Sequence, residues 1–237
     1  IFDEANERWF VTCMNSSHVF VGDVATDEVI ARIDLPGTYP HGLGVDAESN
    51  RIIVTSTIKG DLTDPHDFVS IVDATTYEPL GTQRLSMNAE GSGDAPVEVL
   101  FAPGSSPSIA YVTNMFGATL WTMTWNEGTG EFDAAQVYDF AANESGVALE
   151  MYFNEAGDRL YVTTGKPGHL HVFDVSDIGS PQHLKAIPAG EGAHHVAITK
   201  DEKYAFVQNA LLNLPGLSDG AITVVDLESG EVLASVD

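Results

Sequence analysis

Histidine side chains are the residues of this sequence whose types and positions best suit chemistry at a shared site. The chain has eight histidines. Imidazole is a common ligand of copper, zinc and iron, and carboxylates complete such sites. Five of the histidines stand in expected turns or at the start of an apolar segment, where side chains from separate segments could meet: His41, His66, His169, His194 and His195.

Two of these histidine segments align with each other and with two segments that carry an acid. His41 in segment 40–43 takes the place that His194 takes in segment 193–196. Segments 96–99 and 148–151 resemble them and carry an acid in the same apolar stretch. We therefore predict a ligand site formed by several segments together, with these residues: His41, Glu98, Glu150, His194 and His195.

The spacing leaves the nature of this site open. The five histidines above could hold copper or another transition metal, but no His-Glu-x-x-His pattern is present. Polar side chains at such positions also serve a simpler purpose, because a histidine before an apolar strand can hydrogen-bond the carbonyls of neighbouring loops. The residues thus indicate a polar site without choosing its ligand.

An acidic loop at 56–67 is a second candidate, for calcium. Asp61, Asp64 and Asp67 could offer oxygen ligands, which Ca²⁺ prefers. The EF-hand pattern is absent, so the sequence favours a solvated acidic loop over a calcium site.

An apolar loop at 209–220 is a third candidate, for contact with a partner protein or as a cover for part of the fold. Leucines are unusual in a loop that we expect to be exposed, and exposed apolar patches often mark interaction sites. The leucines in question are Leu211, Leu212, Leu214 and Leu217.

The charge balance narrows the range of partners. The chain of 237 residues holds 35 acidic and 10 basic side chains, for a net charge of −25. Such a charge disfavours nucleic acid and anionic lipid surfaces as partners, and it suits a medium in which salt screens the repulsion. No apolar run approaches the roughly 20 residues that cross a bilayer. We expect an extracytoplasmic protein, periplasmic, secreted or at the cell surface, from a salt-adapted organism.

The elements that must position these side chains recur along the chain as a repeat. The clearest part is a β-branched segment centred on a valine and ending in Val-Thr or a similar pair. The valines are Val11, Val54, Val112, Val162 and Val207, at steps of 43, 58, 50 and 45 residues. A second segment follows in each repeat and ends in Asp before a polar turn, except in the third repeat, where Asn126 takes that place.

This repeat predicts an all-β fold, a β-propeller of four-stranded antiparallel blades. Short strands separated by turn residues at a fixed period are typical of that fold, and stacking of the sheets buries faces that one sheet cannot bury alone. We expect a single domain over 1–237 with no helix longer than a turn. Its five expected repeats are 1–35, 36–85, 86–140, 141–187 and 188–237.

The repeat resembles that of the YVTN family. Tyr111-Val112-Thr113-Asn114 reproduces the tetrad that names the family, and 222–232 matches the tail of its repeat. The resemblance implies a propeller over nearly the whole chain. Propellers of this family usually carry seven blades, so the five visible repeats are expected to be part of a larger ring.

The resemblance leaves the function open, because related propellers include binding proteins, copper oxidoreductases and lactonases. Our first expectation is a module that binds a protein or small-molecule ligand on the face that carries the histidines. A metal-dependent oxidoreductase, most plausibly with copper, is the first alternative, with Glu98 or Glu150 as ligand or proton acceptor. A lactonase-like hydrolase is the second, based on the third repeat alone. No recognised catalytic set decides whether the protein is an enzyme.

Overall fold

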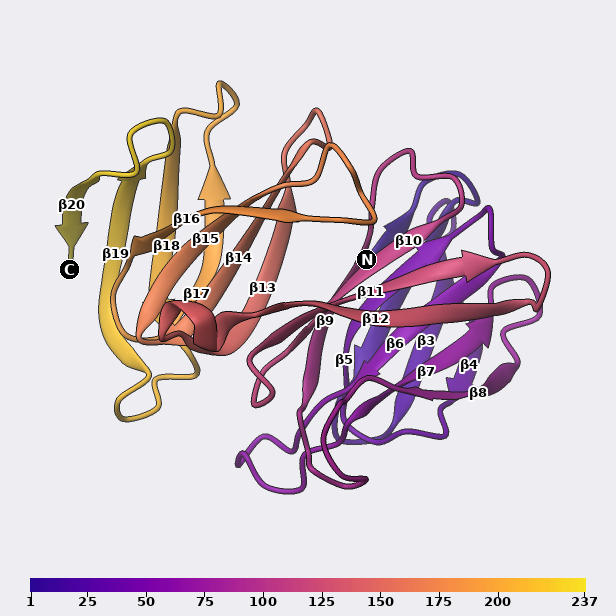
Figure 1. The fold of residues 1–237 in the computed structure, drawn as a ribbon. Helices are drawn as coiled ribbons and strands as arrows, with labels where there is room; N and C mark the ends of the chain where they lie inside the picture. The colour runs from indigo at the N-terminus through magenta and orange to yellow at the C-terminus, as the bar shows by residue number, and fades with distance from the viewer. The chain divides into compact units, whose positions relative to one another are not determined.

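The computed structural model describes residues 1–237, which form five four-stranded antiparallel sheets. Figure 1 shows the strands as arrows, coloured in their order along the chain. The first sheet contains β1 (Phe2–Asp3), β2 (Arg8–Cys13), β3 (His18–Asp23) and β4 (Val29–Asp34). The second contains β5 (Pro40–Asp46), β6 (Arg51–Ser56), β7 (Phe68–Asp73) and β8 (Pro79–Arg84). The third contains β9 (Pro96–Phe101), β10 (Ile109–Asn114), β11 (Thr119–Asn126) and β12 (Glu131–Asp139).

The remaining two sheets follow a single short helix. The 3₁₀ turn η1 (Phe140–Asn143) is the one helical element, so the structure has no helix long or apolar enough to cross a membrane. The fourth sheet contains β13 (Gly146–Phe153), β14 (Arg159–Lys166), β15 (Gly168–Asp174) and β16 (Gln182–Pro188). The fifth contains β17 (Ala193–Ile198), β18 (Tyr204–Ala210), β19 (Ser218–Asp226) and β20 (Val232–Val236).

In every sheet the strands pair in the order in which they follow one another along the chain. Each expected repeat therefore contains one sheet, and the only strand to run past an expected boundary is β16, which ends at Pro188. A meander of this kind is the blade of a β-propeller. The expected fold class is confirmed.

The polar turns follow from the Asp at the end of each third strand. The Asp73 carboxylate accepts hydrogen bonds from the backbone N–H groups of Thr75 and Thr76, and these bonds hold its pKa below the ordinary value. In the third sheet the Asn126 side chain accepts from the N–H of Gly128 in the same way. An amide therefore replaces the carboxylate without loss of the turn.

The chain forms two compact units, residues 1–112 with 121–136 and residues 113–120 with 137–237. In the first unit the β-branched strands meet face to face, as Val21 and Ile33 of one sheet pack with Ile52 and Val54 of the next, and all four side chains are buried. In the second unit a matching core joins the fourth and fifth sheets. Stacked sheets of this kind bury the alternating residues of the repeat.

Candidate functional site

The first strand of a sheet carries a β-bulge at the place where the sequence predicted the site. In β13, Leu149 and Glu150 together lie opposite Thr163, because the register shifts between Ala148 and Met151. The same shift lies between Pro40 and Leu43 in β5 and between Ala193 and Val196 in β17. A bulge changes the direction of its side chains. His41 lies in the bulge of β5, and His194 and His195 lie in the bulge of β17, so all three side chains leave the regular alternation of their strands.

A threonine hydroxyl of the second strand anchors two of these bulges, those of β5 and β13. In the fourth sheet, the Oγ1 atom of Thr163 accepts from the backbone N–H of Glu150 at 3.2 Å. In the second sheet, Thr55 accepts from the N–H of Gly42 at 2.8 Å and donates to the carbonyl of Val97 at 2.8 Å. This threonine belongs to the Val-Thr pair of the repeat. The pair marks a strand in the sequence, and its contribution to the site was not foreseen.

Three of the five predicted residues come together in the second unit. The Oε1 atom of Glu150 lies 3.2 Å from Nε2 of His194 and 3.8 Å from Nδ1 of His195. The two imidazoles are stacked with their centroids 4.1 Å apart. One ligand atom from each residue lies within 4.8 Å of the other two. Two imidazoles and a carboxylate are thus arranged around one point.

The three side chains differ in burial, so the group is shielded from solvent on one side and open to it on the other. The side chains of Glu150 and His194 are 11% and 12% exposed, whereas that of His195 is 61% exposed. A carboxylate removed from water in this way needs a charged or hydrogen-bonding partner. The neighbouring imidazoles provide one, and solvent reaches the group from the side of His195.

Tyr152 adds a fourth polar group, which the sequence analysis missed. Its hydroxyl lies 3.4 Å from Nδ1 of His195 and accepts a hydrogen bond from the N–H of Val196 at 3.3 Å. Its ring packs against the core between the fourth and fifth sheets. The available signal was its position two residues after Glu150 on the same strand.

The other two predicted residues meet in the first unit. Nδ1 of His41 lies 3.0 Å from Oε1 of Glu98, and both side chains are partly buried. They line a hollow of about 240 Å³ together with Thr12 and Leu43. Thr12 donates to the carbonyl of His41 at 2.9 Å, so the anchoring threonine recurs here.

His66 and His169 have other partners. His66 pairs with the hydroxyl of Thr38 and stacks on the ring of Tyr39. His169 lies 3.0 Å from the hydroxyl of Ser145 through its Nδ1 atom. Neither belongs to the group of three ligand atoms. The prediction that His66 and His169 bind a metal therefore gains no support from neighbouring ligand atoms.

The buried His171 and the half-buried His183 form an imidazole pair that the sequence analysis did not single out. Nδ1 of His171 lies 3.1 Å from Nε2 of His183, and Nε2 of His171 lies 3.2 Å from the Thr164 hydroxyl. Burial is the main cause that lowers the pKa of His171 to about 3, with further effects of His183 and His169. Burial also lowers the pKa of His183. This pair is therefore neutral in the folded protein and packs the interior of the fourth sheet.

The three aspartates of the acidic loop do not share a site. Asp61 accepts from Thr63, Asp64 accepts from the hydroxyl of Tyr39, and Asp67 is bound by Arg84 at 2.9 Å. Separate partners hold the three carboxylates. The structure thus adds nothing in favour of calcium in this loop.

The leucines of loop 209–220 differ in exposure. Leu211 is 5% exposed, which fits the expected cover for part of the fold better than a partner contact, and its N–H donates to the carbonyl of Leu217. Leu214 and Leu217 are half-buried, and Leu212 is exposed.

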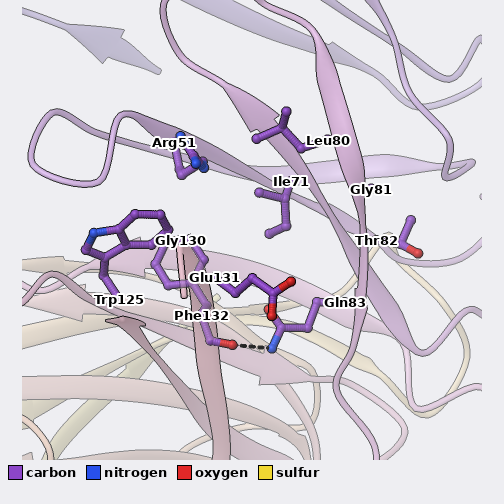
Figure 2. A pocket seen from close by; sticks show the side chains of 10 residues that line it. All are labelled: Arg51, Ile71, Leu80, Gly81, Thr82, Gln83, Trp125, Gly130, Glu131 and Phe132. Atoms are coloured by element: carbon purple, nitrogen blue, oxygen red, sulfur yellow. Dashed lines mark hydrogen bonds between the residues drawn. The ribbon is translucent and has the colours of Figure 1, made fainter. Parts of the chain in front are cut away.

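A hollow of about 370 Å³ in the first unit lies between β8 and the hairpin of β11 and β12. Figure 2 shows Arg51 above the indole of Trp125, 4.9 Å from the ring centroid, and the hydrogen bond from Gln83 to the carbonyl of Phe132. Arg51 also donates to the carbonyl of Asn50. These polar side chains bind one another and the backbone, an arrangement that suits packing between two blades.

Comparisons with known proteins show the fold. No protein-family model matches the sequence, and no curated protein matches it. The structure is similar to the β-propeller domain of Cps50 (Swd1) from Myceliophteria thermophila, with a TM-score of 0.65, 11% identity and coverage of 95% of this chain. It is also similar to NirN, a dihydro-heme d1 dehydrogenase solved in complex with DHE, with a TM-score of 0.63, 16% identity and coverage of 93% of this chain.

These similarities define the class of protein. Each sheet of this chain is a propeller blade, and the chain spans 63% and 42% of the lengths of the two similar chains. At such low identity the likeness carries the fold alone. The site must be interpreted from its own residues.

Proposed function

We propose that this protein is a YVTN-type β-propeller module that binds a transition-metal ion at the bulges in the first strands of its fourth and fifth sheets. The observation that carries the proposal is the convergence of Glu150, His194 and His195, whose ligand atoms lie within 4.8 Å of one another. Such a distance between ligand atoms is close to what one bound ion requires, since metal–nitrogen and metal–oxygen bonds are about 2.0–2.2 Å long.

The donor set favours a transition metal over calcium or magnesium. Two imidazole nitrogens and one carboxylate oxygen suit zinc, copper or iron, whereas calcium takes six to eight oxygen ligands. Copper(II) stands highest in the general order of affinity for such donors. The net charge of −25 also draws cations toward the protein.

The location of the protein is part of the proposal. A large negative charge suits an extracytoplasmic, salt-rich medium, because salt there screens the repulsion between carboxylates. In such a medium a propeller with an open metal position can bind a small ligand or a protein side chain through the ion. The protein would then be a ligand-binding module whose binding site contains a metal ion.

Titration calorimetry with Cu²⁺ and Zn²⁺ tests the proposal. We expect one ion to bind per chain, and we expect the double variant Glu150→Gln, His194→Ala to lose most of that binding. His18→Ala is the matched control, since His18 pairs with Asp34 and lies outside the group of ligand atoms. Absence of binding in the unmodified protein, or equal binding in the double variant, would refute the site.

Copper redox catalysis is a second candidate, and the exposure of His195 favours it. An ion held on the buried side by Glu150 and His194 would keep a position open toward solvent, as catalytic metal sites do. Reversible reduction of the bound copper by ascorbate, followed by reoxidation in air with the ion retained, would support this candidate. Loss of the ion on reduction would exclude it.

A further inference from the structure

Core packing and a backbone hydrogen bond hold the hydroxyl of Tyr152 beside the proposed ion site. The tyrosine ring packs against the core that joins the fourth and fifth sheets, which fixes the direction of the side chain. The N–H of Val196 then donates to the hydroxyl at 3.3 Å. Val196 follows the bulge that carries both histidines, so the phenol oxygen and the imidazoles are positioned by the same few backbone atoms.

The same hydroxyl lies 3.4 Å from Nδ1 of His195, the atom that faces Oε1 of Glu150 at 3.8 Å. The phenol oxygen therefore lies beside one of the three predicted ligand residues, on the atom that also faces Glu150. We propose that Tyr152 is the fourth protein ligand of the site, as a phenolate oxygen, and that the site is thereby selective for copper(II) over zinc. This inference rests on the proposed metal site.

The chemistry of the step is a ligand exchange without oxidation or reduction. Copper(II) forms a bond to the phenol oxygen, the O–H bond breaks, and the proton passes to solvent on the open side of His195. Metal ligands must lose their protons before they bind. The resulting donor set is two nitrogens and two oxygens, and tetragonal sites with such donors are typical of copper(II).

Optical titration with Cu²⁺ tests the assignment, because a phenolate bound to copper(II) gives a charge-transfer band in the visible range. We expect the unmodified protein to show this band and Tyr152→Phe to lack it. The variant keeps the ring and its packing, and we expect its affinity for Cu²⁺ to fall roughly 10- to 100-fold, as in other sites that lose a positioning or ligand group. The affinity for Zn²⁺ should change less.

Tyr161→Phe is the matched control. Tyr161 is the cross-strand neighbour of Tyr152 and is 4% exposed. The charged groups that act on its hydroxyl are Glu202, Arg159 and Asp158, not the predicted ligands. We expect this variant to keep the band and the affinity.

The outcomes separate this inference from the proposed function. Copper binding without the band, together with equal affinity in Tyr152→Phe, would overturn the tyrosine assignment and leave the site of Glu150, His194 and His195 intact. Absence of any copper binding by the unmodified protein would overturn both.

Discussion

At the scale of single residues, the site depends on which side chains are buried with partners and which are left open to solvent. Glu150 and His194 are largely buried and contact each other, whereas His195 is mostly exposed. The buried pair can hold an ion, and the exposed imidazole can exchange its own contacts for a ligand. The buried side chains would thus retain the ion, and the exposed one would let a ligand reach it.

The buried pair of His171 and His183 predicts a pH dependence of stability. Unfolded His171 takes up a proton below about pH 6.5, whereas in the folded protein its pKa is about 3. The unfolded state therefore binds more protons in that interval, and stability is lost as the pH falls from about 6.5 toward 3. The lowered pKa of His183 acts in the same direction.

Urea unfolding at a series of pH values measures this dependence. His171→Asn should reduce the slope between pH 6.5 and 4, since an amide does not titrate. The lowered pKa of the turn carboxylate Asp73 adds a loss of stability only below about pH 4, so the two effects separate on the pH axis. A variant with an unchanged slope would contradict the assignment to His171.

At the scale of elements, the bulge and its threonine form one device that recurs from sheet to sheet. The Thr163 hydroxyl binds the N–H of Glu150, and the Thr113 hydroxyl donates to the carbonyl of Leu149 at 2.6 Å. Each threonine is fully buried. A hydroxyl in this place fixes the backbone from which the ligand side chains project.

Thr163→Val should therefore weaken both the fold and the site. The isosteric change leaves the buried N–H of Glu150 without its acceptor, which costs about 1–3 kcal/mol of unfolding free energy. We expect weaker Cu²⁺ binding as well, because the bulge that carries Glu150 loses its anchor. Thr55→Val is the matched control, because it removes the corresponding buried hydroxyl beside Gly42 in the first unit. It should lower stability without a comparable effect on copper binding at Glu150.

Urea denaturation and copper titration on the same preparations check the two effects. Equal copper affinity in Thr163→Val and the unmodified protein would show that the bulge holds its shape without the hydroxyl.

The sequence predicted the strands well because each repeat carries the same alternation and the same turn residues. It also predicted that His41 and His194 take the same place in their repeats, and both are the first residue of a bulge. It could not predict which of the predicted site residues meet, because the bulges in β5, β13 and β17 leave no mark in the apolar pattern. Tyr152 was missed for the same reason, since its hydroxyl reaches the site only through a register that two bulges set. The burial of Leu211 could not be predicted, because composition marks its loop as exposed.

At the scale of the whole molecule, charge is the dominant feature. All five arginines pair with aspartates, at distances of 2.7–3.7 Å. With 35 acidic and 10 basic residues, most carboxylates have no cationic side chain to pair with. Their repulsion acts against the folded state until salt screens it.

The melting temperature should therefore rise between about 0.1 M and 1 M sodium chloride, as the Debye length falls from about 10 Å to about 3 Å. Chloride is the suitable anion, because sulfate would also strengthen apolar burial. Differential scanning calorimetry makes the measurement. A melting temperature that is constant or lower at 1 M would contradict the account of the charge and with it the argument for a salt-rich location.

Electron paramagnetic resonance of the protein loaded with one equivalent of Cu²⁺ shows directly whether the two histidines hold one ion. We expect a single copper(II) species with coupling to two imidazole nitrogens, reduced to one in either His194→Ala or His195→Ala. A spectrum of free copper, or a species that neither variant changes, would contradict this expectation.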